Sequence, residues 1–346
     1  MRALASLLLE LLLPLVMTSD IHDYYTEIKP CTSAAPLTTV FQSFPVTSRI
    51  RCADICSATS TCKAFSMSTD GTRTCSLHKE PSTVVTCTSA EKYFHKLSES
   101  PCLNEGVYNS STDTCQCFNG YIGSRCEKIM QDCTEGFRSG INTDKDVFWI
   151  FPKLAPAPFK VECWMQTRRV TIIQHQRYGN VSFVRSWAEY KSGFGQILGD
   201  HWLGNDHVFH VTNSRPQELA MTLQATNSPL TLARYHVYEN FRISDESDQY
   251  RLNFTSERSI NNLGDCLTSL KNAPFSTIDV NNADTCASDF NAGWWFATDT
   301  CSACNLNGFL HRELFYWSNV VSHTHWTPMP NNFGVFEVLI FLAANP

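Results

Sequence analysis

The sequence predicts a multidomain protein in which small cysteine-dense modules precede one larger domain with an aromatic core. The chain has 346 residues, which is more than one core usually holds at about 150 residues per domain. Ten of the 16 cysteines lie between Cys31 and Cys126. All eight tryptophans and 17 of the 22 phenylalanines follow residue 132. A short region that depends on disulfides is therefore followed by about 210 residues that can bury their own core.

The overall composition excludes two classes of protein. Hydrophobic residues make up 43% of the chain and charged residues 17%, which is typical of folded domains and excludes a disordered chain. The formal net charge of −6 provides no basic field that could attract phosphate groups. We therefore expect no nucleic-acid partner.

The first 19 residues have the pattern of a cleaved secretory signal peptide. Arg2 supplies the positive start, residues 7–16 are mostly apolar, and Thr18 and Ser19 are small residues near the expected cleavage point. Glu10 interrupts the apolar run, which disfavours a retained membrane anchor. The only other apolar stretch, residues 335–344, is too short to cross a membrane and is expected to form a terminal strand. The sequence thus predicts a secreted, extracellular protein without a membrane span.

Export has two chemical consequences for this protein. Cysteines in an oxidising compartment are expected to form disulfides. Sequons of the form N-x-S/T become sites for glycosylation, and three occur, at Asn109, Asn180 and Asn253. A fourth candidate at Asn227 is excluded because Pro229 occupies the third position, which must be Ser or Thr.

The first module, residues 31–97, contains six cysteines. Cys52 and Cys56 are four residues apart, so both sulfurs lie on one face of a helix that Thr47 or Ser48 can cap. The segments KAFSM and TCSLHK are predicted to form short strands on either side of a turn. Spacing alone leaves 15 disulfide connectivities open. The order of these motifs, RCADICSATSTCKAF and then TCSLHK, resembles the PAN/apple family of small α+β domains. The resemblance implies three disulfides: Cys52–Cys75, Cys56–Cys62 and Cys31–Cys87.

The second module, residues 102–127, resembles part of an EGF-like module. The similarity lies in C-x-C followed by G-Y-x-G-x-x-C. The usual module has six cysteines, and here the first and third, which pair with each other in the family, are both missing. The resemblance implies a short stapled spacer without calcium, held by the disulfides Cys102–Cys115 and Cys117–Cys126.

The third domain, residues 132–346, resembles the fibrinogen C-terminal domain over nearly its whole length. The motifs that show the similarity include DCTEGFRSGI, FVRSWAEYKSGFG, GDHWLGND, FST, GWWF and NLNG. PFKVEC and VTIIQH have the character of strands, and SWAEYKSGFG predicts a helix that ends at Gly193. The resemblance implies an α+β fold with a central twisted sheet and a loop-rich lobe. It also implies two disulfides, Cys133–Cys163 and Cys286–Cys301.

Cys266 and Cys304 have no counterpart in that family. Because every other cysteine has an implied partner, the simplest prediction is that these two pair with each other; free thiols and bridges between chains are the alternatives. Cys301 and Cys304 also form a C-x-x-C motif, the spacing of thiol oxidoreductases. We do not assign redox catalysis, because Cys301 already has an implied partner.

Some members of the fibrinogen family, the ficolins and tachylectins, bind acetyl groups of sugars in a shallow pocket beside the loop between FST and NLNG. The resemblance implies that an aromatic wall holds the methyl group while backbone amides orient the carbonyl. Transferred by position, the candidate ligand-binding residues are Phe290, Ser302, Ala303, Cys304, Asn305, Phe309 and Tyr316. Trp294 and Trp295 are expected to belong to the core.

Calcium is the only cofactor that the resemblance suggests, and the sequence departs from the family at this point. The family site follows FST with closely spaced aspartates, because calcium prefers six to eight oxygen ligands. Here two ligand aspartates are replaced by Asn281 and Ala283. If calcium binds, Asp279, Asn281 and Asp284 are the expected donors.

The sequence contains no H-E-x-x-H, G-x-S-x-G or P-loop motif, so we expect a binding protein and no enzyme. Two hypotheses remain: a lectin-like protein that binds acetylated glycans in innate immunity, or a matrix or adhesion protein that contacts other extracellular proteins. No collagen-like or heptad repeat links the modules. Avidity would therefore need a homo-oligomer or an interchain bridge.

Overall fold

The computed structural model describes residues 24–27, 40–68, 71–79, 91–97, 100–109, 112–225, 234–260, 263–310, 324–326 and 335–344. The chain divides into two compact units, Met1–Gln116 and Cys117–Pro346, and each is described by itself. The predicted signal peptide and the predicted pair Cys31–Cys87 lie outside the described residues. The division between the units falls inside the four-cysteine module expected at residues 102–127.

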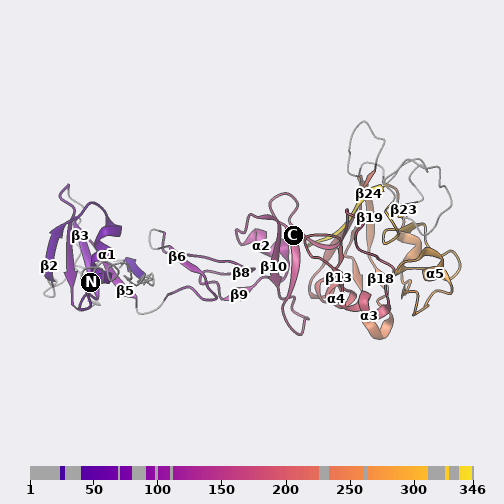
Figure 1. The fold of residues 1–346 in the computed structure, drawn as a ribbon, viewed down its shortest axis with the longest axis horizontal. Helices are drawn as coiled ribbons and strands as arrows, with labels where there is room; N and C mark the ends of the chain where they lie inside the picture. The colour runs from indigo at the N-terminus through magenta and orange to yellow at the C-terminus, as the bar shows by residue number, and fades with distance from the viewer. Residues whose placement is uncertain are drawn as a thin grey trace, which may run out of the picture. The chain divides into compact units, whose positions relative to one another are not determined.

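Within its described residues, the first unit contains one helix and an antiparallel sheet (Figure 1). The strand order in this sheet is β1-β5-β3-β4-β2. Its elements are β1 (Tyr24–Glu27), β2 (Val40–Pro45), α1 (Arg49–Ala58), β3 (Ala64–Ser68), β4 (Thr74–His78), β5 (Glu91–Leu97), β6 (Val107–Asn109) and β7 (Thr114–Gln116). The side chain of Ser48 caps α1 by accepting a hydrogen bond from the Arg51 amide. The predicted helix and its cap are therefore confirmed.

Disulfides join this helix to strand β4 and to the segment before β3. The structure contains Cys52–Cys75 and Cys56–Cys62, and the sulfur atoms pack with Phe65, Leu77 and Phe94 in a small buried cluster. The pair Cys102–Cys115 staples the β6–β7 hairpin. Covalent links thus supplement a core that is too small to hold the unit alone.

The second unit is built on a nine-stranded antiparallel sheet with the central order β10-β11-β12-β24-β15-β16-β19; β14 branches from β12 and pairs with β13. The sheet strands are β10 (Asp144–Ile150), β11 (Phe159–Trp164), β12 (Val170–Gln176), β13 (Phe194–Gly195), β14 (His201–Trp202), β15 (Gln217–Ala225), β16 (Arg234–Glu239), β19 (Ser256–Ile260) and β24 (Val335–Ala344). The apolar stretch at the end of the sequence thus forms the expected strand. It lies in the middle of the sheet, between β12 and β15.

Short helices and hairpins complete this unit. The helices are α2 (Cys133–Arg138), α3 (Trp187–Ser192), α4 (Asn205–Ser214) and α5 (Cys286–Phe290), with 3₁₀ turns η1 (Glu246–Asp248) and η2 (Thr268–Leu270). The short strands are β8 (Tyr121–Ile122), β9 (Lys128–Ile129), β17 (Arg242–Ile243), β18 (Leu252–Asn253), β20 (Phe275–Ser276), β21 (Trp294–Trp295), β22 (Cys304–Asn305) and β23 (His325–Trp326). Helix α3 starts with a capping box between Ser186 and Glu189 and is terminated at Gly193. The end of this helix at Gly193 was predicted.

The large core of this unit is aromatic. Tyr190, Trp202, Phe275 and Trp295 are almost completely buried, and their ring centroids lie 5.2–6.3 Å apart. Gly293 fits against this cluster because a Cβ atom there would approach the Tyr190 ring to 2.4 Å. The Trp and Phe residues concentrated after residue 132 therefore form the core that the composition predicted.

A single buried carboxylate organises the loop that follows β12. Asp200 accepts hydrogen bonds from the amides of Arg177 and Tyr178 at 2.7 and 2.8 Å and from those of Gly179 and Asn180 at 2.6 and 3.2 Å. Asp200 is 1% exposed, so water cannot easily replace it.

We expect Asp200→Ala to lower the free energy of unfolding by at least about 3 kcal/mol, because several amide groups would lose a charged acceptor together. Asp299 is exposed, and Asp299→Ala, the matched control, should change it by less than about 0.5 kcal/mol. Urea unfolding followed by tryptophan fluorescence measures both variants. Equal stabilities of the two would contradict the role of this carboxylate.

Candidate functional site

The lobe, defined here as residues 263–310, is the region to which the sequence assigned ligand binding. It contains the antiparallel pair of β20 and β21, in which Phe275 pairs with Trp295. Trp294 and Trp295 are at most 1% exposed, and the indole N–H of Trp295 donates to the carbonyl of Tyr250 at 2.8 Å. Both tryptophans therefore belong to the core, as predicted, and form part of the buried interior of the lobe.

Three buried amide side chains hold the NLNG segment of the lobe in place. Gln174 and Gln176 on β12 donate to the carbonyls of Leu306 and Gly308 at 3.0 and 3.1 Å. Asn307 donates to the carbonyl of Gly293 at 2.8 Å. The central sheet thus fixes the backbone of this segment directly.

The structure divides the predicted ligand-binding residues into a buried and an exposed group. Cys304 and Asn305 have no exposed surface, and Phe290 is 6% exposed; the Asn305 amide donates to the Phe290 carbonyl at 3.1 Å. These three side chains form the interior of the lobe and are not presented at its surface.

The remaining predicted residues are more accessible. Ser302 and Ala303 are half-buried, and Phe309 is 47% exposed. Tyr316 lies outside the described residues. Phe309 therefore provides most of the exposed apolar surface among the predicted ligand-binding residues that the structure describes. Ser302 and Ala303, which precede it in the sequence, are partly accessible.

The structure also resolves the pairing of the two additional cysteines. Cys266 and Cys304 form a disulfide with each other, next to the implied pair Cys286–Cys301. Cys133–Cys163 and Cys117–Cys126 are present as well. No free cysteine occurs in the described parts of the protein, which excludes a free thiol or an interchain bridge at Cys266 and Cys304.

Asp279, one of the residues expected to bind calcium, already makes hydrogen bonds within the protein. Asp279 accepts hydrogen bonds from the Trp187 amide, at 2.9 and 3.2 Å to its two oxygens, and from the Thr277 hydroxyl at 2.7 Å. Within the described residues, no three histidine, cysteine, aspartate or glutamate side chains are grouped to hold a metal. Calcium binding by Asp279, Asn281 and Asp284 stays a prediction, and Asp279 would have to exchange these hydrogen bonds for contacts with the ion.

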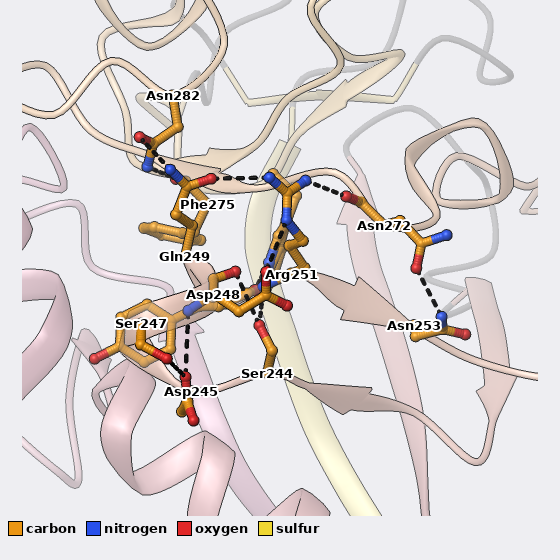
Figure 2. Close-up of polar contacts among 12 residues, drawn as sticks. Ser244, Asp245, Ser247, Asp248, Gln249, Arg251, Asn253, Asn272, Phe275 and Asn282 are labelled. Carbon is orange, nitrogen blue, oxygen red and sulfur yellow. Dashed lines mark hydrogen bonds and ion pairs between the residues drawn. The ribbon is translucent and has the colours of Figure 1, made fainter.

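An arginine-centred network lies beside this loop (Figure 2). The Arg251 guanidinium donates to the Asn272 carbonyl at 2.7 Å, to the Gln249 side chain at 2.9 Å and to Asp248 at 3.2 Å. Gln249 in turn donates to Asn282 at 3.1 Å. The side chains of Arg251 and Gln249 thus link the turn at residues 244–249 to Asn282 in the loop after β20.

A buried charge cluster on the sheet was not found from the sequence. The His175 Nε2 atom lies 3.0 Å from a Glu337 oxygen, and its Nδ1 atom lies 3.6 Å from a Glu162 oxygen. Burial by itself would lower the pKa of His175, but the two carboxylates outweigh it and raise this pKa to about 9. The His175 charge in turn offsets the effect of burial on Glu337, whose pKa is held below its ordinary value. The one sequence signal was a charged residue, Glu337, inside an apolar strand.

The three predicted glycosylation sites differ in their surroundings. Asn109 and Asn180 are exposed. Asn253 is half-buried, and its side-chain amide donates to Asn272 at 2.8 Å, so a glycan there would replace an existing contact. The prediction is therefore better supported at Asn109 and Asn180.

Comparison with known proteins identifies the larger domain. The family model of the C-terminal globular domain of fibrinogen beta and gamma chains matches residues 129–340. Mouse angiopoietin-4 is 36% identical over 53% of this chain, and human angiopoietin-4 is 37% identical over 53%. Both alignments cover 36% of the relative, so the match spans about a third of the length of these relatives.

Solved structures agree with this match. The fibrinogen-like globe domain of human ANGPTL6 is 27% identical and covers 63% of this chain and 97% of its own, with a TM-score of 0.57. The corresponding domain of human ANGPTL2 has the same identity and TM-score and is covered completely. Lamprey fibrin D-dimer, solved with the peptide Gly-His-Arg-Pro-amide, is 24% identical with a TM-score of 0.53 and supports the fold alone.

Proposed function

Because the chain belongs to the fibrinogen C-terminal domain family, a non-catalytic binding family, we propose that it is an extracellular recognition protein whose lobe binds acetylated glycans. Its relatives and its many disulfides indicate a secreted protein. Among the described residues, no helix is long and apolar enough to cross a membrane.

The observation that supports glycan recognition best is an accessible aromatic side chain next to a backbone segment that buried hydrogen bonds hold in place. Phe309 is 47% exposed and directly follows the NLNG backbone, which Gln174, Gln176 and Asn307 fix through buried hydrogen bonds. Sites for small neutral ligands combine apolar contact with a few fixed polar groups. An acetyl methyl group would contact Phe309, and Ser302, which precedes it in the same segment, would provide a polar group.

Retention on an acetylated resin tests this proposal. We expect the full chain with intact disulfides to bind such a resin and to elute with free acetate or N-acetylglucosamine. Phe309→Ala should lose most of this retention. Leu198 is 54% exposed outside the lobe, and Leu198→Ala provides a matched control that should keep it. Passage of the intact protein through the resin, with and without calcium, would exclude the glycan proposal.

Contact with another extracellular protein is the second candidate function. It is favoured by the burial of Phe290, Cys304 and Asn305, which leaves fewer of the predicted pocket residues accessible to a small ligand. The first unit, whose helix and disulfides support the PAN/apple prediction, would provide a further contact surface. Under this alternative, Phe309→Ala would weaken binding to a protein partner while acetate would not compete.

A further inference from the structure

We infer that the Cys266–Cys304 disulfide is the positioning element of the lobe, and that it holds the recognition segment in a calcium-independent arrangement. The disulfide is not part of the family pattern, and two aspartates of that pattern's calcium site are replaced by Asn281 and Ala283 in this protein. The inference rests on the proposed function only in taking the lobe as the recognition surface. Its structural content, a lobe ordered by protein groups without a cation, stands separately.

The first step concerns the loop in which a cation would be expected. The carboxylate of Asp279 receives the Trp187 amide, the first of helix α3, together with the Thr277 hydroxyl. Ala283 is completely buried and offers only an apolar side chain. A hard cation needs several converging oxygens. Here the Asp279 carboxylate instead connects the loop to α3 through the hydrogen bond from the Trp187 amide.

The second step is that protein groups close the same loop from its other side. The Asn282 side chain donates to the Phe275 carbonyl at 2.8 Å and accepts from Gln249 at 3.1 Å. Gln249 is held by Arg251, as Figure 2 shows. The backbone of Phe275 adds a hydrogen bond to the Gln249 carbonyl at 2.9 Å. The loop after β20 is therefore connected at both ends without a metal.

The third step places one end of the disulfide on the central sheet. The hydroxyl of Tyr238, a buried residue of β16, accepts hydrogen bonds from the amides of Cys266 and Leu267 at 3.1 and 3.2 Å. The same hydroxyl donates to Asp265 at 3.0 Å. The backbone at Cys266, near the start of the lobe, is thus hydrogen-bonded to the sheet through Tyr238.

The other end of the disulfide lies in the recognition segment. Cys304 is the first residue of β22 and is completely buried. It lies between the half-buried Ser302 and Ala303 and the exposed Phe309. The disulfide therefore links the backbone that presents the accessible side chains to Cys266, which hydrogen bonds tie to β16, across a separation of 38 residues.

Amide hydrogen exchange of the full chain, without any ligand, tests both parts of the inference. In the wild type, exchange in residues 275–286 should be the same in calcium and in a chelator. In Cys266→Ala/Cys304→Ala, exchange in residues 301–310 should accelerate at least about tenfold more than exchange in β12 and β15, because a local restraint is lost in addition to global stability. Cys102→Ala/Cys115→Ala, which removes a disulfide of the first unit, should leave residues 301–310 unchanged.

Two results would overturn the inference. Slower exchange of residues 275–286 in calcium would show that a cation orders the loop. Unchanged exchange of residues 301–310 in the alanine pair would show that the disulfide does not position the segment. If the alanine pair does not fold, Cys266→Val/Cys304→Val, which refills more of the space of the sulfurs, is measured in the same way. Since no ligand is used, failure of acetyl-resin retention would refute the proposed function and leave this result unaffected.

Discussion

Replacement of His175 by leucine is expected to lower the free energy of unfolding by about 3–5 kcal/mol, the usual cost of removing one partner from a buried ion pair. His175, Glu162 and Glu337 are all at most 6% exposed. Without the imidazolium, two carboxylates would remain buried near each other with no positive charge between them. Arg177, whose Nε atom lies 4.0 Å from Glu337, is half exposed and cannot replace it.

The control for this prediction removes the whole cluster. In the triple variant His175→Leu/Glu162→Leu/Glu337→Leu, no unpaired charge is left, and we expect at least half of the lost stability to return. Chemical unfolding of the three proteins at one pH measures the difference. A His175→Leu variant as stable as the wild type would show that the cluster does not hold an ionised histidine.

The pH dependence of stability provides a second measure of the same cluster. A raised pKa in the folded state contributes stability that is fully present below the ordinary histidine value of about 6.5 and is lost as pH rises through the folded-state value. For His175 that value is about 9. The lowered pKa of Glu337 acts in the opposite direction, and its contribution is lost as pH falls. His201 also lies near the cluster, and burial lowers its pKa, so it remains neutral.

We therefore expect the wild type to lose stability between about pH 6.5 and pH 9 through this histidine, and His175→Leu to lose correspondingly less. Denaturant unfolding across this range, with the disulfides kept oxidised, measures both proteins. Parallel pH profiles of the wild type and the variant would contradict the assignment of the charge to His175.

Removal of the Cys266–Cys304 disulfide is the second change with a large expected effect. The two residues are 38 apart, and closing a loop of that length restricts the unfolded chain by about 4 kcal/mol in the chain-entropy model. We expect Cys266→Ala/Cys304→Ala to be less stable by roughly 3–4 kcal/mol when the second unit unfolds. Unfolding monitored by tryptophan fluorescence reports on this unit, because every tryptophan follows residue 132. A loss of stability below about 1 kcal/mol would show that the unfolded chain already keeps this loop ordered without the disulfide.

Several features could be predicted because their signals are local in the sequence. The capped helix with Cys52 and Cys56, the glycine end of α3, and the strand nature of residues 335–344 all follow from short patterns. The pairing of Cys266 with Cys304 was favoured by elimination, since no other cysteine lacked an implied partner.

Other features could not be predicted because they depend on strand order and burial. The last strand enters the sheet between β12 and β15, and only this insertion brings Glu337 to His175, 162 residues away in sequence. Asn305 and Cys304 were expected at a ligand surface, but a motif does not indicate which side of a loop faces the solvent. The hydrogen bond from Asn305 to the Phe290 carbonyl shows that this side chain points inward.

The measurement that tests the central claim most directly is amide hydrogen exchange of the intact protein with and without N-acetylglucosamine, in the presence of a chelator. We expect slower exchange confined to residues 301–310 around Phe309. No ligand-dependent change anywhere in the protein, or protection found only outside the lobe, would contradict the claim that the lobe is a calcium-independent site for acetylated glycans.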